Sequence, residues 1–122
     1  MTRTILAIDD SSTIRQMLAM TLGSAGHRVL QAEDGLAGYS LATTEHVDVV
    51  ITDLNMPVMD GLDFVRMYRT HPSSQGVPIL LLSTESSDRF KRQAKDAGAT
   101  GWITKPFRQD QLLAVVERLV GA

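Results

Sequence analysis

Short apolar runs alternate along the chain with longer amphipathic stretches. The first run, TILAI, ends at a pair of aspartates, and four similar runs follow it. Compact apolar runs bounded by turn residues are typical of strands that are buried on both faces. The predicted strands cover residues 4–8, 28–32, 48–52, 78–82 and 100–103.

Each run is followed by a stretch whose apolar residues recur at helical spacing. The first of these stretches has Ser11 or Ser12 placed to cap it and Gly26 placed to end it. The five predicted helices lie at about residues 14–25, 35–44, 62–68, 90–97 and 112–120.

Strands and helices that alternate in this way predict a parallel sheet with helices on both faces. Right-handed crossovers reduce the number of topologies, and the flavodoxin-like strand order 2-1-3-4-5 is the common one at this size. We therefore expect a (βα)5 three-layer α/β sandwich with five parallel strands in that order. The pattern alone leaves open an order with a different switch point.

Composition narrows the class of protein. The 122 residues suit one domain, and a hydrophobic content of 43% is enough for a packed core. The sequence has no cysteine, which excludes disulfides, thiolate metal sites and a cysteine nucleophile. A net charge of -2 argues against a domain built mainly to coat nucleic acid. No apolar run approaches the roughly 18 residues that a membrane span needs. Because two aspartates come too early for a signal peptide, we expect a cytoplasmic protein.

Reactive side chains follow four of the predicted strands. Asp9 and Asp10 follow the first strand, Asp53 the third, Ser83 the fourth and Lys105 the fifth. With the order 2-1-3-4-5 these four strands are neighbours, and ligands bind outside their carboxyl ends. Each residue alone fits a helix cap or a turn, but together they predict a site.

Three carboxylates that lie close together repel one another unless a cation joins them. A few hard oxygen ligands suit Mg²⁺, and a phosphoryl group would bridge the metal and Lys105. The Ser83 hydroxyl would donate a hydrogen bond to that group. Because phosphoryl transfer needs mainly positioning and charge neutralisation, these groups are sufficient for it. One carboxylate could itself be the nucleophile and become an aspartyl phosphate.

Four segments resemble, in order, the motifs of the receiver domain of two-component response regulators. They are Ile8–Ser11 (IDDS), Asp53–Gly61 (DLNMPVMDG), Leu82–Glu85 (LSTE) and Lys105–Phe107 (KPF). The NMPVMDG loop and the final KPF are most similar to single-domain chemotaxis regulators of the CheY type. The resemblance covers the whole chain and implies a monomeric receiver domain over residues 1–122 with no output domain.

The resemblance also implies roles for the residues of the site. Asp53 would accept a phosphoryl group from the phosphohistidine of a histidine kinase. Asp10, Asp53 and the backbone carbonyl of Asn55 would bind Mg²⁺ directly, and Asp9 would bind it through a water. Lys105 would pair with the phosphoryl oxygens, held by a cis peptide bond to the next proline.

Other positions are implied to transmit or tune the signal. Ser83 is the switch hydroxyl, where threonine is commoner, and Trp102 is the switch aromatic, where tyrosine or phenylalanine is commoner. Asn55 and Glu85 would tune the loss of the phosphoryl group to water. The partner surface would be that of the fourth helix, the fifth strand, including Trp102, and the last helix. Its basic residues are Arg89, Lys91, Arg92 and Lys95. A solvated helix face explains this basic set equally well.

The resemblance implies a signalling protein that catalyses only its own phosphotransfer and autodephosphorylation. Its output partner would be a protein such as a flagellar motor switch component, and a phosphatase would be a further partner. The protein would bind neither nucleic acid nor a membrane. A phosphate sink or intermediate phosphorelay carrier is the alternative. A flavodoxin-type FMN electron carrier fits less well, because Asp9 and Asp10 would repel the FMN phosphate. A haloacid-dehalogenase-like phosphatase would carry an aspartate where Ser11 stands.

Overall fold

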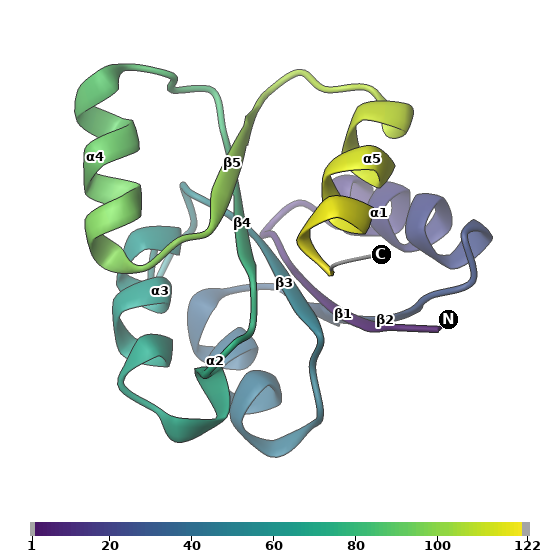
Figure 1. Cartoon of the computed structure of the whole chain (residues 1–122), viewed down its shortest axis with the longest axis horizontal. Helices are drawn as coiled ribbons and strands as arrows, with labels where there is room; N and C mark the ends of the chain where they lie inside the picture. The colour runs from purple at the N-terminus through teal and green to yellow at the C-terminus, as the bar shows by residue number, and fades with distance from the viewer. Residues whose placement is uncertain (1, 121–122) are drawn as a thin grey trace.

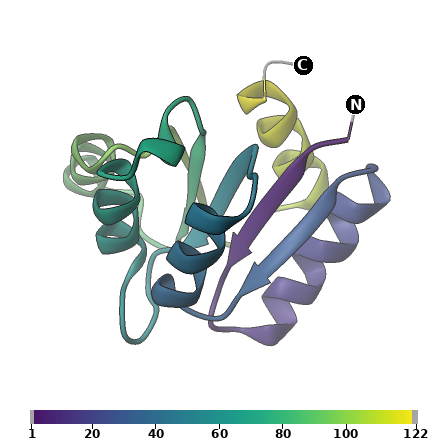
Figure 2. The ribbon, with the colours of Figure 1, turned by 90° about the horizontal axis from the view of Figure 1, so that it is seen from below.

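The computed structural model describes residues 2–120, and the five strands of this part form one parallel sheet in the order β2-β1-β3-β4-β5. Figure 2 shows neighbouring strands running in the same direction. This arrangement confirms the predicted flavodoxin-like fold. The strands are β1 (Thr4–Ile8), β2 (Arg28–Ala32), β3 (Val49–Asp53), β4 (Ile79–Ser83) and β5 (Gly101–Thr104).

Helices cover both faces of the sheet (Figure 1). One face carries α1 (Ser12–Ser24) and α5 (Gln109–Leu119). The other carries α2 (Gly35–Thr44), α3 (Gly61–Arg69) and α4 (Asp88–Ala97), with the short 3-10 helix η1 (Pro72–Ser74) after α3. Over residues 2–120, none of the helices has the length and apolar character that crossing a membrane requires.

The strands separate two hydrophobic cores because successive side chains point to opposite faces. In β1, Ile5 and Ala7 pack under α1 and α5, whereas Leu6 and Ile8 pack under the other three helices. Strands β3 and β4 are buried over their whole length. Burial of one Leu or Ile side chain contributes about 1.5–3 kcal/mol, so the central strands hold the sheet rigidly beneath the site.

Three strands begin and end one residue later than predicted. β3 includes Asp53 and β4 includes Ser83, because the hydrogen-bonded ladder continues past the apolar runs. The N–H of Leu54 donates to the carbonyl of Leu82 at 3.0 Å, and the N–H of Lys105 donates to the carbonyl of Ser83 at 2.7 Å. The sheet itself therefore fixes the backbone of the reactive residues.

Ser11 caps α1, as one of the two predictions had it. Its hydroxyl oxygen accepts the N–H of Ile14 at 3.3 Å. The helix ends at Ser24 with Ala25 as its C-cap, and the predicted Gly26 follows the cap with a left-handed φ of 92°.

Candidate functional site

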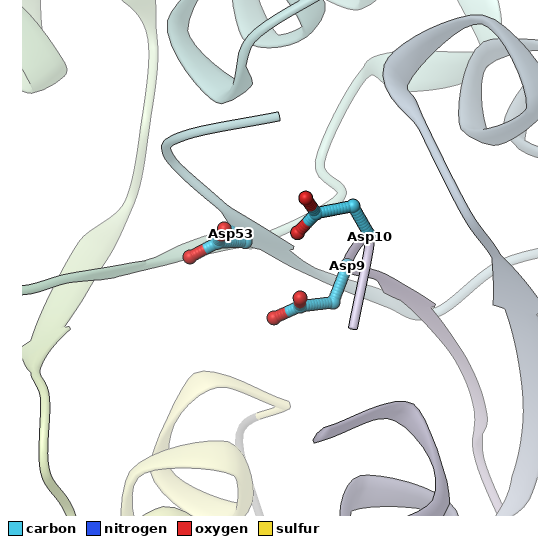
Figure 3. Close-up of side chains that lie close together, drawn as sticks. All are labelled: Asp9, Asp10 and Asp53. Carbon is cyan, nitrogen blue, oxygen red and sulfur yellow. The ribbon is translucent and has the colours of Figure 1, made fainter. Parts of the chain in front are cut away.

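Three carboxyl groups meet beyond the carboxyl ends of β1 and β3 (Figure 3). Asp9 and Asp10 follow β1, and Asp53 is the last residue of β3. Because these strands are direct neighbours in the sheet, one oxygen from each carboxylate lies within 4.8 Å of the others. Asp9 and Asp53 are buried, whereas Asp10 is exposed to solvent.

Lys105 brings a positive charge to this cluster. Its Nζ donates a hydrogen bond to Oδ1 of Asp53 at 2.7 Å and lies 3.7 Å from Oδ2 of Asp9. The peptide bond between Lys105 and Pro106 is cis, as the resemblance implied. The prediction that the four strand ends converge is therefore correct for the carboxylates and the lysine.

The buried Asp9 carboxyl has only one of its two oxygens hydrogen-bonded within the described part of the chain. Its Oδ1 accepts the N–H of Ser11 at 2.9 Å, but its buried Oδ2 has no hydrogen-bond partner within the described part of the chain. Burial raises the pKa of Asp9, and the charges of Asp53 and Asp10 act in the same direction, against the opposing effects of Ser11 and Lys105.

A divalent cation fits this arrangement. It would supply a partner for the orphaned Asp9 oxygen and would offset the repulsion among the three carboxylates. Hard oxygen donors in small number, with one exposed side toward solvent, match the preference of Mg²⁺ for a few protein ligands and several waters.

The loop from β3 to α3 folds back tightly at the carboxyl end of β3. The Gly61 N–H donates to the carbonyl of Leu54 at 2.8 Å, and a Cβ on Gly61 would overlap the Asp53 carbonyl, so only glycine fits there. Asn55 is exposed in this loop. Val58 has a φ of 71°, a left-handed conformation that is uncommon for a β-branched residue.

Ser83 lies at the end of β4 with its side chain buried. Its hydroxyl oxygen accepts the N–H of Glu85 at 2.8 Å, which leaves the hydroxyl hydrogen available for another acceptor. Glu85 is exposed, and its Oε1 accepts a hydrogen bond from Ser87, the N-cap of α4.

Trp102 is half-buried on β5, outside the carboxylate cluster. Its ring meets that of Phe90 edge to face at a centroid distance of 6.5 Å, and Nζ of Lys91 lies 6.0 Å from its centroid. The predicted basic set thus divides in two. Lys91 is half-buried against the indole, whereas the other three basic residues are exposed: Arg89, Arg92 and Lys95.

Two features of the site were not predicted. The Arg15 side chain, from α1, donates a hydrogen bond to the Asp9 backbone carbonyl. A cleft of about 290 Å³ opens beside Lys105, with mainly apolar walls. The one sequence signal for this cleft is Phe107, an apolar ring within an otherwise polar loop. Its lining residues are Ile14, Met17, Thr84, Lys105, Pro106 and Phe107.

Comparison with known proteins agrees with this geometry. The model of the response regulator receiver domain family matches residues 5–117. The chain is 39% identical over 119 residues to the chemotaxis protein CheY homolog of Campylobacter jejuni, which covers 96% of this chain and 92% of that protein.

Solved structures give the same result. The chemotaxis protein CheY4 of Vibrio cholerae superposes with a TM-score of 0.94 and 43% identity, over 98% of this chain and 99% of that chain. The receiver domain of the sensor histidine kinase PA1611 from Pseudomonas aeruginosa, which has a magnesium ion coordinated in its active site cleft, superposes with a TM-score of 0.91 and 25% identity over the whole of both chains. The chain therefore belongs to the response regulator receiver domain family and is a phosphorylation-controlled two-component switch of the CheY type.

Proposed function

We propose that Asp53 is the phosphoacceptor of this receiver. One of its carboxylate oxygens forms a bond to phosphorus as the phosphorus–nitrogen bond of a donor phosphohistidine breaks, and the electron pair leaves with the imidazole nitrogen. The observation that carries the proposal is the position of Asp53. Its carboxylate is buried, lies within 4.8 Å of the carboxylates of Asp9 and Asp10, and is 2.7 Å from Nζ of Lys105.

Lys105 would hold the phosphoryl oxygens in place and neutralise part of their charge. Asp10, Asp53 and the backbone carbonyl of Asn55 would hold Mg²⁺ directly, with Asp9 acting through a water. When bound, the metal supplies charge neutralisation at the same oxygens. Support comes from the unpartnered Asp9 oxygen and from the magnesium ion in the PA1611 receiver domain.

The signal would pass from Asp53 to the surface formed by α4, β5 and α5. The free hydroxyl hydrogen of Ser83 would be donated to a phosphoryl oxygen, and Trp102 would turn toward the core. A ligand shifts such an equilibrium by binding one state better than the other. Asn55 and Glu85 would tune autodephosphorylation, because both are exposed to solvent and each follows a site residue, Asp53 or Ser83, by two positions.

Labelling with a small phosphodonor tests the acceptor. Wild-type protein with Mg²⁺ and phosphoramidate should gain the mass of one phosphoryl group, and Asp53→Asn should gain none. Asp63→Asn is the matched control, because Asp63 is an exposed carboxylate on α3 that pairs with Arg66 at 3.1 Å. Full labelling of Asp53→Asn would remove Asp53 from its proposed role.

The output would be a cytoplasmic partner that binds the activated surface, and the names of the chemotaxis relatives favour a flagellar motor switch component. A pull-down with and without beryllofluoride identifies proteins that bind only the activated state. Recovery of a flagellar motor switch component supports the motor assignment. Return of the phosphoryl group to the kinase, with no partner recovered, supports the phosphate-sink alternative.

A further inference from the structure

The two ends of α4 are attached to the molecule in different ways. The C-terminal end turns at Gly98, whose φ of 110° is left-handed, and its N–H donates to the carbonyl of Lys95 at 3.0 Å. Two residues later, Thr100 exchanges hydrogen bonds with Ile79 of β4: its N–H donates to the Ile79 carbonyl at 2.8 Å, and its hydroxyl oxygen accepts the Ile79 N–H at 3.0 Å. This end is therefore joined to the central sheet.

Arg69, in the last turn of α3, adds a second attachment across 29 residues of sequence. Its Nε donates to the carbonyl of Gly98 at 2.9 Å, and its Nη1 donates to the carbonyl of Ser74 at 2.7 Å. The guanidinium thus joins α3, η1 and the end of α4 in one hydrogen-bonded unit.

The chemistry of this contact suits a positioning role. Over residues 2–120, no carboxylate lies within 4 Å of the Arg69 guanidinium, so its identified partners are backbone carbonyls. A helix C-terminus carries a partial negative charge, which the half-buried guanidinium offsets. The approach is close: a Cβ on Gly98 would lie 2.7 Å from Cγ of Arg69.

The N-terminal end of α4 packs through the buried Phe90 but makes no hydrogen bond to another helix among the described residues. Residues 84–87 are all exposed, and the hydrogen bonds found for this segment stay within residues 83–91. Glu85 bonds to Ser83, and Ser87 bonds to Glu85 and caps the helix through the N–H of Phe90 at 3.1 Å. This end is tied to Ser83, which lies one residue beyond the register partner of Asp53 on β4.

We propose that Arg69 is a positioning residue that fixes the C-terminal end of α4, so that the helix pivots there when the receiver is activated. The proposal rests on the proposed function of Asp53 and Ser83. A helix of 10 residues is roughly 15 Å long, so a rotation of about 10° displaces its first turn by about 2.5 Å. That displacement falls on Phe90, which contacts Trp102.

Backbone amide chemical shifts of the wild-type protein test the pivot. On addition of Mg²⁺ and beryllofluoride, the changes over residues 84–91 should be at least threefold larger than those over residues 95–100. Equal changes at the two ends, together with changes around Asp53, would overturn the pivot and leave the proposed function standing. The absence of any change around Asp53 would overturn the proposed function and the pivot with it.

Variants assign the pivot to Arg69. Arg69→Met keeps the aliphatic stem and removes the donors, so the ratio of the two sets of shifts should fall to about one, while labelling of Asp53 by phosphoramidate stays within twofold. Arg66→Met is the matched control, because Arg66 is an exposed arginine of the same helix. Arg69→Lys keeps the charge but cannot donate to both carbonyls as the guanidinium does, so it should give an intermediate ratio. This variant is the decisive one if Arg69→Met does not fold. A wild-type ratio in every folded Arg69 variant would overturn the assignment.

Discussion

Two aspartates at opposite ends of the sheet have opposite environments. Asp48 stands just before β3, and its Oδ2 accepts the N–H of Thr4 at 2.8 Å while Oδ1 lies 3.0 Å from His46. These interactions, the Thr4 hydrogen bond first, lower the pKa of Asp48. Asp9, just after β1, has a buried oxygen without a hydrogen bond from the described residues and a pKa that burial raises.

The difference shows that the mutually repelling carboxylates lie at the carboxyl ends of the strands. At the amino ends of the strands, polar groups satisfy one another and stabilise the sheet. At the carboxyl ends, carboxylates are held close together at a cost in stability, and a bound cation would offset that cost. The following predictions test this contrast.

The largest effect is expected from Lys105→Met, which removes the positive charge beside Asp53 and leaves a side chain of similar length. Labelling of Asp53 by phosphoramidate should slow on the order of 100-fold, because an electrostatic contact to the phosphoryl oxygens is lost. Lys95→Met, at an exposed position of α4, should label at the wild-type rate. A rate for Lys105→Met within twofold of wild type would contradict the role given to Lys105.

Asp9→Asn should stabilise the metal-free protein. The substitution removes a buried charge and keeps the shape of the side chain, so the free energy of unfolding should rise by about 1 kcal/mol in the presence of a chelator. Urea denaturation measures this value, and Mg²⁺ should stabilise the variant less than the wild type. A variant that is less stable than wild type in chelator would show that Asp9 is not under strain.

The same substitution at the other end, Asp48→Asn, should have the opposite sign. The charge-assisted hydrogen bond from the Thr4 N–H becomes a neutral one, and the free energy of unfolding should fall by about 0.5 kcal/mol. His46→Gln, which changes only the exposed partner of Asp48, should leave the stability nearly unchanged. Equal signs for the Asp9 and Asp48 variants would remove the contrast between the two ends.

The smallest effect is in the pH dependence of stability without metal. Asp9 keeps its proton to a higher pH in the folded state than when unfolded, so its contribution decreases as pH rises from 3.8 through the raised pKa. Asp48 behaves in the opposite way: its contribution is present above 3.8 and is lost as pH falls through the lowered pKa. Because asparagine does not titrate in this range, the pH dependence of the melting temperature should lose the Asp9 contribution in Asp9→Asn and the Asp48 contribution in Asp48→Asn.

The sequence was sufficient for the fold and for the outline of the site. Parallel strands expose their ends at one edge, so the position of Asp53 after an apolar run already placed it beside Asp9 and Asp10. The pattern of TILAI and its counterparts also located all five strands to within one residue. That single-residue difference arises because hydrogen bonding, rather than hydrophobicity, decides where β3 and β4 end.

Contacts between side chains distant in sequence could not be predicted. Local spacing placed Lys91 on the outer face of α4, but the angle between α4 and β5 brings its Nζ over the Trp102 ring. The link from Arg69 to Gly98 depends in the same way on how two helices pack. The unpartnered oxygen of Asp9 depends on the rotamer of one buried side chain, which no sequence pattern specifies.

The positions of the site residues along the chain also determine when the site is complete during synthesis. The site takes its groups from β1, β3 and the segment after β5, so a nascent chain that has exposed both aspartate-bearing strands still lacks Lys105 and the helix that follows it. Nascent chains of intermediate length have the acidic cluster but lack the ammonium group of Lys105. The site is therefore assembled only once Lys105, the last of these groups along the sequence, has been synthesised.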